Sequence, residues 1–191
     1  MAARNATRTL YQLKAVLVGV SPPLWRRVLV SSKMKLGTLH AVLQVAFGWN
    51  DCHLHQFEAG GKVWGSREME QYDELPMGDE DKVTIGQVLR GVGGSLLYTY
   101  DFGDDWRHKL TLERVIPDPA VVFPDASCLT GKRGSPQEDS GGPWGYGDLV
   151  AILKDPSHEE YSERREWAGE DFDPERFDLI GINSVLKTIK V

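Results

Sequence analysis

Histidine and aspartate side chains that could bind a metal ion occur in two short segments of this chain. Asp51, His53 and His55 occupy alternate positions in the first segment, and Asp104 and His108 lie in the second. In a β-strand, residues at i and i+2 point to the same face, so the two histidines of the first segment would face one ligand together. If the two segments are neighbours, they would hold a divalent ion such as zinc or manganese, which polarises a bound water molecule. The candidate metal ligands are His53, His55, Asp104 and His108.

The same histidines also have a structural interpretation, which is the outcome we expect. His53 and His55 would share a strand face with Phe57 and be half-buried. Their hydrogen-bond partners would be Asp51, Asp101 or backbone carbonyls. In that case replacing His53 by alanine lowers stability through lost hydrogen bonds and changes no metal content. The wider candidate patch consists of Asp51, His53, His55, Asp101, Asp104, Trp106 and His108.

The second segment lies in a predicted β-hairpin over residues 96–116. Its turn is expected to be the three-residue loop Gly103–Asp105, because glycine and aspartate are common turn residues. The expected cross-strand pairs are Phe102 with Trp106, Tyr100 with His108, Tyr98 with Leu110, Leu96 with Leu112, Asp101 with Arg107 and Thr99 with Lys109. The first four pairs make an aromatic and apolar face, which we expect to point into the core.

Short motifs in a fixed order extend along nearly the whole chain. They are Tyr11–Lys14, Pro22–Arg27, Leu39 with His40, Phe47–Trp49, His53–Phe57, Tyr100–Asp104 with Trp106 and His108, Gly141–Tyr146 and Asp171–Glu175. Together they resemble the plasmid pRiA4b ORF-3-like family, whose members are often described as passenger proteins of an insertion element. That description concerns genetic neighbourhood, so the resemblance implies no particular reaction.

The cysteines depart from the pattern of that family. Members often carry several cysteines near the position of Cys128, whereas this chain has Ser135 and Ser140 at the matching places. A thiolate metal site or a disulfide there is therefore not implied for this chain. Cys52 and Cys128 are far apart in the sequence and form no Cys-x-x-Cys motif, so both are expected to be reduced thiols.

Length and composition favour a cytoplasmic, single-domain protein over residues 1–191. The chain has 191 residues, of which 41% are hydrophobic and 26% are charged, which is enough for one core. It has no apolar run of the ~20 residues that a membrane span requires, and its first residues lack the apolar stretch of a signal peptide. We therefore expect no membrane association.

Charge is distributed unevenly along the chain. Residues 1–35 carry seven basic side chains and no acidic one, whereas residues 158–178 carry nine acids and three bases. Arg26 and Arg27 are expected to form part of a basic surface that attracts polyanions. The pI of about 5.4 argues against a dedicated nucleic-acid-binding domain, for which a pI above about 9 is usual.

Hydrophobic patterning predicts an α+β fold. Residues 11–20 and 25–30 are predicted strands, and the next apolar residues, Leu36, Leu39, Leu43 and Phe47, share one face of a predicted helix that ends at Gly48. Further strands are expected over 53–59, 62–64 and 96–116, with a short helix over 85–90. This ββαββ-type start favours a mixed or largely antiparallel sheet with a helix packed on it, and is compatible with a β-grasp-like arrangement.

The remainder of the chain is predicted to be a loop followed by helices. Residues 117–144 contain five prolines and four glycines, which predicts a long irregular loop, and loops of that length are often functional. Helices are expected over 145–191, one begun by a capping box at Ser157-x-x-Glu160 and the last capped by Asp178. Trp144 is expected to contact a surface groove or a partner.

Motifs of common enzymes are absent from the sequence. There is no P-loop, no His-Glu-x-x-His and no nucleophile elbow. We therefore expect a binding or accessory module associated with mobile DNA elements, with an unidentified protein or nucleic-acid partner. The alternative is a metal-dependent, hydrolase-like enzyme that uses the 51–55 and 101–108 segments. An enzyme needs those side chains to converge in an open pocket, whereas a binding module needs an exposed apolar or basic patch.

Overall fold

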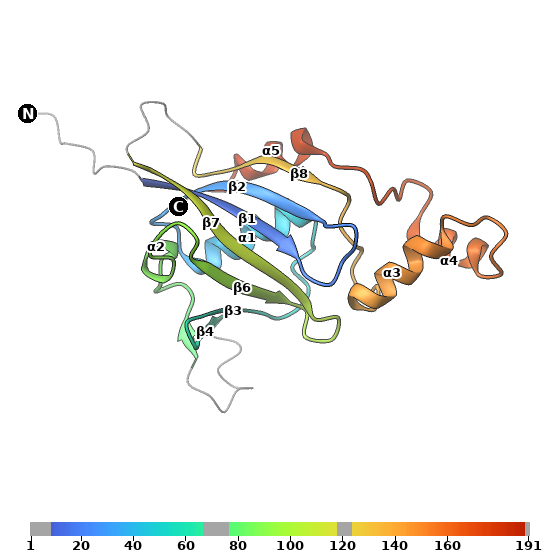
Figure 1. The fold of residues 1–191 in the computed structure, drawn as a ribbon, viewed down its shortest axis with the longest axis horizontal. Helices are drawn as coiled ribbons and strands as arrows, with labels where there is room; N and C mark the ends of the chain where they lie inside the picture. Colours follow the sequence, from blue (N-terminus) through green and yellow to red (C-terminus); the bar gives the residue numbers. More distant parts are fainter. Residues whose placement is uncertain (1–8, 67–76, 118–123, 190–191) are drawn as a thin grey trace, which may run out of the picture.

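A computed structural model describes residues 9–66, 77–117 and 124–189. It contains one eight-stranded sheet in the order β5-β4-β3-β6-β7-β1-β2-β8 (Figure 1). The strands are β1 (Thr9–Leu17), β2 (Trp25–Ser31), β3 (His55–Ala59), β4 (Lys62–Gly65), β5 (Gly78–Asp79), β6 (Ser95–Tyr100), β7 (Trp106–Pro117) and β8 (Ala126–Lys132). The helices are α1 (Leu36–Phe47), α2 (Ile85–Val88), α3 (Gly142–Ile152), α4 (Tyr161–Ala168) and α5 (Leu179–Leu186).

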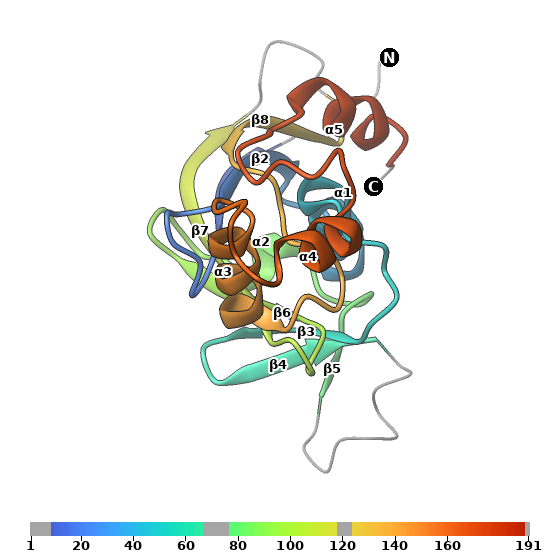
Figure 2. The same cartoon turned by 90° about the vertical axis from the view of Figure 1, so that its right-hand side faces the viewer.

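The sheet is mixed, and the predicted α+β class is confirmed. Every neighbouring pair is antiparallel except β4 with β5, which is parallel. The sheet curves around α1, which lies against one face (Figure 2). Alternate residues of β1, such as Leu13, Ala15 and Leu17, are buried under that helix, whereas Gln12 and Lys14 lie on the opposite face. This alternation is what the period of two in a strand requires.

Helix α1 forms as its pattern predicts. Its buried face includes Leu36, Leu39, Leu43 and Phe47. The helix ends at Gly48, whose φ of 72° is left-handed and whose N–H donates to the carbonyl of Gln44. Glycine adopts this conformation without the strain that a Cβ would cause, so the stop signal in the sequence is confirmed.

The C-terminal helices occupy two separate places. Helix α5 lies beside β8, where the Asn183 side chain accepts from the Cys128 N–H at 2.9 Å and donates to its carbonyl at 2.8 Å. These two bonds satisfy part of the edge of the sheet, which would otherwise be exposed for pairing. Asp178 caps α5 by accepting from Gly181 N–H, as predicted. Helices α3 and α4 extend beyond the end of the sheet (Figure 1).

Two local predictions for the second half of the chain are wrong. The predicted loop over 117–144 contains strand β8, which pairs with β2, and α3 already begins at Gly142; residues 118–123 lie outside the described residues. Pairing with β2 outweighs the weak strand signal of this glycine-containing segment. The capping box is also not formed, because Ser157 bonds Asp155 instead and α4 begins at Tyr161.

The β6–β7 hairpin forms, but with a longer loop than predicted. The observed pairs are Tyr100 with Trp106, Tyr98 with His108, Leu96 with Leu110, Thr99 with Arg107 and Leu97 with Lys109. Asp101 leaves the strand because its Oδ1 accepts from the N–H groups of Gly103 and Asp104, at 2.9 and 3.3 Å. A shift of two residues keeps the aromatic face in the core, but Phe102 becomes exposed.

Two predictions from composition can be compared with the structure. Within the described ranges, no helix is long and apolar enough to cross a membrane. Both cysteines are free: Cys128 is buried beside α5, and Cys52 is exposed in the loop between α1 and β3.

Candidate functional site

Three chain segments meet at the end of the sheet where β6 finishes. They are the loop between α1 and β3, the β6–β7 loop, and the segment between β8 and α3. Asp104 joins the last two, because its Oδ2 accepts from the Gly141 N–H at 3.1 Å. Two groups of histidines and carboxylates lie here, and they differ in how their polar atoms are satisfied.

The first group is a stacked pair of histidines, His40 from α1 and His55 from β3. Their rings are parallel to within 5°, with centroids 3.5 Å apart. His40 Nδ1 is 2.7 Å from the Tyr98 hydroxyl and its Nε2 is 2.7 Å from Asp51 Oδ1. His55 Nε2 is 2.9 Å from Glu80 Oε2. Burial, followed by the neighbouring His55 ring, lowers the pKa of His40, so a neutral His40 that donates to Asp51 and accepts from Tyr98 fits this network.

The second group surrounds His53, which lies in the loop before β3. Its Nε2 is 3.4 Å from Asp139 Oδ1, 3.6 Å from Asp101 Oδ2 and 3.9 Å from Glu138 Oε2. None of these distances is a hydrogen bond. His53 Nε2 and Glu138 Oε2 are both buried atoms without a hydrogen-bond partner among the described residues. We call His53, Asp101, Glu138 and Asp139 the His53 cluster.

Two carboxylates of the His53 cluster are held by one oxygen each. Glu138 Oε1 accepts from the Asn50 N–H at 2.7 Å and from the Tyr100 hydroxyl at 3.0 Å. Asp101 Oδ1 accepts from the β6–β7 loop, as described above. Burial raises the pKa of Tyr100, so its hydroxyl keeps its proton and remains a donor. In each carboxylate the second oxygen is therefore turned toward His53.

The spacing of the His53 cluster is close to that of ligand atoms around one metal ion, and the 3.4 Å between His53 Nε2 and Asp139 Oδ1 falls within it. Ligand atoms about 2.1 Å from an ion lie roughly 3.0–3.5 Å from one another in octahedral or tetrahedral geometry. The ligand atoms of His53, Asp101 and Asp139 all lie within 4.8 Å of one another, as do those of Cys52, His53 and Glu138. Outer hydrogen bonds that orient the ligands, as for Glu138 and Asp101, are typical of metal sites.

The predicted set of four ligands is not brought together. Only His53 belongs to the cluster. His55 lies in strand β3 and its side chain contacts Glu80. His53 precedes that strand, so its side chain does not share the direction of His55. Asp104 binds the backbone at Gly141. His108 lies in the core and cannot reach a ligand at the surface.

His108 and Trp106 are core residues, both fully buried. His108 Nε2 is 3.4 Å from Trp49 Nε1, which donates to it, so His108 Nδ1 carries the proton and donates to the Trp106 carbonyl at 3.0 Å. Burial lowers the pKa of His108 to about 3, and the ring is neutral at physiological pH. Its two nitrogens are thus already used within the fold.

Several residues of the site were not predicted from the sequence. Glu138 and Asp139 lie in the segment predicted to be an irregular loop, and His40 was expected only at the edge of the helix core. The run Pro136–Gly142, which combines two adjacent acids with turn residues, is the signal that could have indicated ligands. For His40 the signal is weaker, since it lies one position after the buried Leu39 on the same helix face.

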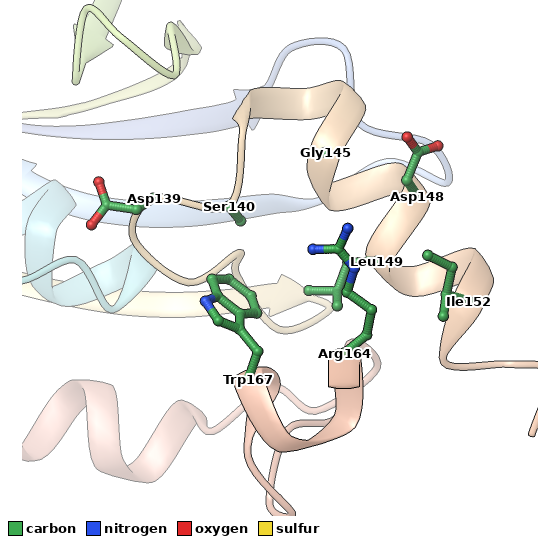
Figure 3. A pocket seen from close by; sticks show the side chains of 8 residues that line it. All are labelled: Asp139, Ser140, Gly145, Asp148, Leu149, Ile152, Arg164 and Trp167. Carbon is green, nitrogen blue, oxygen red and sulfur yellow. The ribbon is translucent and has the colours of Figure 1, made fainter. Parts of the chain in front are cut away.

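Two hollows adjoin the cluster. One, of about 190 Å³, opens between α3 and α4 and has Asp139 at its edge. In Figure 3, Trp167 and Arg164 extend from α4 toward Leu149 of α3, while the carboxylate of Asp139 points away from both helices. The other hollow is lined by Asn50, Glu138 and the Phe47–Gly48 end of α1, and Trp167 borders it as well.

The predicted basic surface at Arg26 and Arg27 is not formed. Arg26 is only 3% exposed, and its guanidinium donates to the carbonyls of Ala46 and Lys132 and to the Ser135 hydroxyl. Arg27 makes a bidentate pair with Glu113. Arg26 is thus used within the fold, and Arg27 is paired with a carboxylate. Arg4 and Arg8 lie outside the described residues.

Comparisons with known proteins agree with the resemblance seen in the motifs. The family model described as plasmid pRiA4b ORF-3-like protein matches residues 9–180. The chain is 36% identical over 177 residues to the uncharacterized protein y4hQ of Sinorhizobium fredii, covering 92% of this chain and 89% of that protein. It also resembles the crystal structure of a protein of unknown function, MM3350 from Methanosarcina mazei Go1, with a TM-score of 0.80, 37% identity and coverage of 90% and 96%.

Proposed function

This chain belongs to the plasmid pRiA4b ORF-3-like family, and from the geometry of its own site we propose that it binds a divalent metal ion in the His53 cluster. One observation carries the proposal. The buried Nε2 of His53 faces oxygen atoms of three carboxylates at 3.4–3.9 Å without a hydrogen bond to any of them. An ion held by His53, Asp101 and Asp139, whose ligand atoms all lie within 4.8 Å of one another, would give the unpartnered Nε2 and the two carboxylate oxygens that face it a common partner.

A protonated His53 paired with the carboxylates is the competing explanation. Charge-assisted N–H···O bonds in proteins are short, about 2.7–2.9 Å. In the same chain, imidazole nitrogens of His40 and His55 lie at hydrogen-bond distances of 2.7 and 2.9 Å from carboxylate oxygens. The longer separations around His53 therefore favour a bound cation over a proton.

The ligand types restrict which ion is bound. One imidazole with two carboxylates, as in the set of His53, Asp101 and Asp139, suits zinc or manganese, since imidazole favours the first and hard oxygen ligands favour the second. Cys52 lies close enough to His53 and Glu138 to add a thiolate, which would select zinc. Asp139 is 77% exposed and His53 28% exposed in their side chains, so the site opens to solvent. An ion there would keep a water ligand, and lowering the pKa of that water is the chemistry of metal-dependent hydrolases.

Titration of the protein with Mn²⁺ and Zn²⁺ tests the proposal. We expect about one equivalent to bind by calorimetry. Asp101→Asn keeps the loop-capping oxygen but removes a charged ligand, and should weaken binding by about 10–100-fold. Asp104→Asn is the matched control in the same loop, and should bind as the wild type does, because its carboxylate bonds Gly141 and faces no ion.

Two results would contradict the proposal. One is the absence of binding of either ion at micromolar concentrations. The other is an equal loss of affinity in Asp101→Asn and Asp104→Asn, which would point to diffuse charge and not to a defined site. Thermal melts of all three proteins exclude unfolding as the cause of a loss.

A second candidate function is that of a protein-binding accessory module. It is favoured by two aromatic side chains near the start of α3. Trp144 is 87% exposed and Phe102 is 45% exposed, and their segments touch, because the Asp104 carbonyl packs against Gly142. A photo-crosslinking residue placed at Trp144 in cells should capture one partner repeatedly. The same group at Glu159 should not, and equal capture at both positions would remove this candidate.

A further inference from the structure

One face of the eight-stranded sheet has no described helix packed on it. Helix α1 lies against the other face, and α5 contacts α1. In Figure 1 the strands lie in front of α1, and none of the described helices lies in front of the strands. Side chains on this side alternate with buried ones, as Lys14 does with Leu13 and Ala15. We call this side of the sheet the open face.

Strand pairing places lysines on both sides of a tryptophan on the open face. Trp25 of β2 pairs with Lys132 of β8 and with Val16 of β1, and Val16 pairs in turn with Lys109 of β7. Residues directly opposite each other on neighbouring strands share a face, so these four side chains form one row. Trp25 is partly exposed, and both lysines are exposed.

The next row adds a third lysine beside the same indole. Lys14 pairs with Arg27 of β2 and with Thr111 of β7. The Lys14 ammonium and the Arg27 guanidinium each lie 5.1 Å from the centroid of the Trp25 ring, which is within the range of a cation–π contact. Cations from β1, β2 and β8 thus adjoin one indole.

The three lysines of the open face are not neutralised by described residues. Two arginines of this face are paired with carboxylates, Arg27 with Glu113 and Arg107 with Asp105. The lysines at positions 14, 109 and 132 form no ion pair with any residue that the structure describes. Glu58 of β3 lies in the row of Lys109, on the far side of Leu97. The part of the open face from β7 to β8 is therefore positive, although the chain carries a formal net charge of -6, and its unpaired charge comes from lysines and not from the arginines that the sequence indicated.

We propose that the open face binds a single-stranded nucleic acid, with a base stacked on Trp25 and phosphates next to Lys14, Lys109 and Lys132. Single strands bind proteins through cations that follow the backbone and aromatic rings on which bases stack. A sheet face that presents aromatic rings for stacking is a common platform for single-stranded RNA. A duplex keeps its bases stacked within the helix and offers none to the indole. An acidic peptide or an anionic lipid surface would contact the lysines but offers no base to stack on Trp25.

Fluorescence anisotropy with a labelled single-stranded DNA of mixed sequence tests this proposal. The comparison probes are the same sequence as a duplex and a glutamate-rich peptide, and co-sedimentation measures binding to vesicles of anionic phospholipid. We expect the single strand to bind most tightly. The logarithm of its binding constant should fall with the logarithm of the salt concentration with a slope of about −2, because each of three neutralised phosphates contributes about −0.7. A chelator in every sample keeps the test independent of the proposed metal site.

Matched variants locate the binding. Lys14→Gln/Lys109→Gln removes two charges from the open face and should make the salt slope less steep by about 1.4. Lys154→Gln/Lys187→Gln removes two exposed lysines that follow α3 and α5, so it should bind as the wild type does. Trp25→Leu should weaken binding by about 5- to 100-fold, because a stacked base is lost. Its salt slope should stay unchanged, because no phosphate contact is removed.

Four results would overturn the proposal. They are the absence of binding of the single strand at low ionic strength, equal binding of the duplex, the peptide or the vesicles, equal losses in the two lysine pairs, and unchanged affinity in Trp25→Leu. Trp25→Phe keeps a ring for stacking and should lose less affinity than Trp25→Leu does. Circular dichroism and thermal melts verify that each variant is folded.

Discussion

The two histidine groups of this protein lie side by side in the sequence but differ in what their polar atoms contact. His55 Nε2 is bonded to Glu80, and the ring stacks on His40, which has a partner for each of its nitrogens. His53, two residues earlier, faces three carboxylates and bonds none of them. Buried polar groups are nearly always paired in native proteins, and an unpaired one needs an explanation. The comparison therefore separates histidines whose hydrogen bonds lie within the fold from the histidine that we propose as a metal ligand.

Backbone position explains the difference. His55 belongs to β3, whose pairing with Tyr100 of β6 fixes the direction of its side chain. His53 precedes the strand, just after Asp51, which has a positive φ of 55°. The loop turns there, so His53 points toward the β6–β7 loop and the segment before α3. The expectation that His53 and His55 point to the same face of a strand is wrong, because only His55 lies in β3.

The largest effect is expected from exchanging the histidine of the proposed metal site. His53→Ala should lower the affinity for Mn²⁺ or Zn²⁺ by about 100-fold or more, because the imidazole is the one nitrogen ligand among carboxylates. His55→Ala is the matched control and should retain the wild-type affinity. Elemental analysis of the purified proteins and calorimetry provide the two measurements. Retention of stoichiometric metal by His53→Ala would show that the comparison is wrong.

The stability of the two variants should follow the opposite order. His55→Ala leaves Glu80 buried without its hydrogen-bond partner, and an orphaned buried polar group costs about 1–3 kcal/mol. His53→Ala breaks no hydrogen bond seen among the described residues, so in the absence of metal its free energy of unfolding should stay within about 1 kcal/mol of the wild type. Urea unfolding in the presence of a chelator measures both. If His53→Ala proves the less stable variant, His53 has a structural role after all.

A third prediction concerns the pH dependence of stability. The pKa of His108 is lowered to about 3 by burial, whereas in the unfolded chain it is near 6.5. Between these values only the unfolded state binds the proton, so stability falls as the pH falls below about 6.5. The loss should be on the order of 2 kcal/mol between pH 6.5 and pH 5. Thermal melts over this range should show it, and His108→Gln should have a flatter profile.

His40 accounts for the pH dependence of stability that remains in His108→Gln. The pKa of His40 is also lowered, chiefly by burial. Protonation of His40 in the unfolded chain therefore also lowers stability as the pH falls. An unchanged pH profile in His108→Gln would mean that His108 is not the buried neutral ring described above.

The smallest effect is expected at the sheet surface, where Arg27 pairs with Glu113. The hydrogen bond from Arg27 lowers the pKa of Glu113 to about 2, so this pair stabilises the fold above about pH 4.5 and stops doing so as the pH falls through 2. Because both side chains are partly exposed, Glu113→Gln should cost only about 0–1 kcal/mol at neutral pH. Chemical unfolding at pH 7 tests this. A cost as large as that of His55→Ala would contradict the distinction between buried and exposed pairs.

The sequence by itself determined those features that depend on near neighbours. The apolar face of α1 and its stop at Gly48, the strands that flank Pro22 and Pro23, and the Asp178 cap of α5 formed as predicted. The hairpin of β6 and β7 also formed, but its register is shifted by two residues. Each results from periodicity or from a backbone preference over a few residues. The same local information showed the family, because its motifs are short and occur in a fixed order.

Only the tertiary structure decided which distant groups meet. Strand β8 exists because β2 offers it an unpaired edge, and Arg26 is buried because α1 and β8 close over it with acceptors. The His53 cluster draws its side chains from three loops, and the length of one of them was set by a single bond pattern at Asp101. Loop direction depends on such non-local packing and not on residue propensity, which is why the sequence indicated His53 as a candidate but not Glu138 and Asp139 beside it.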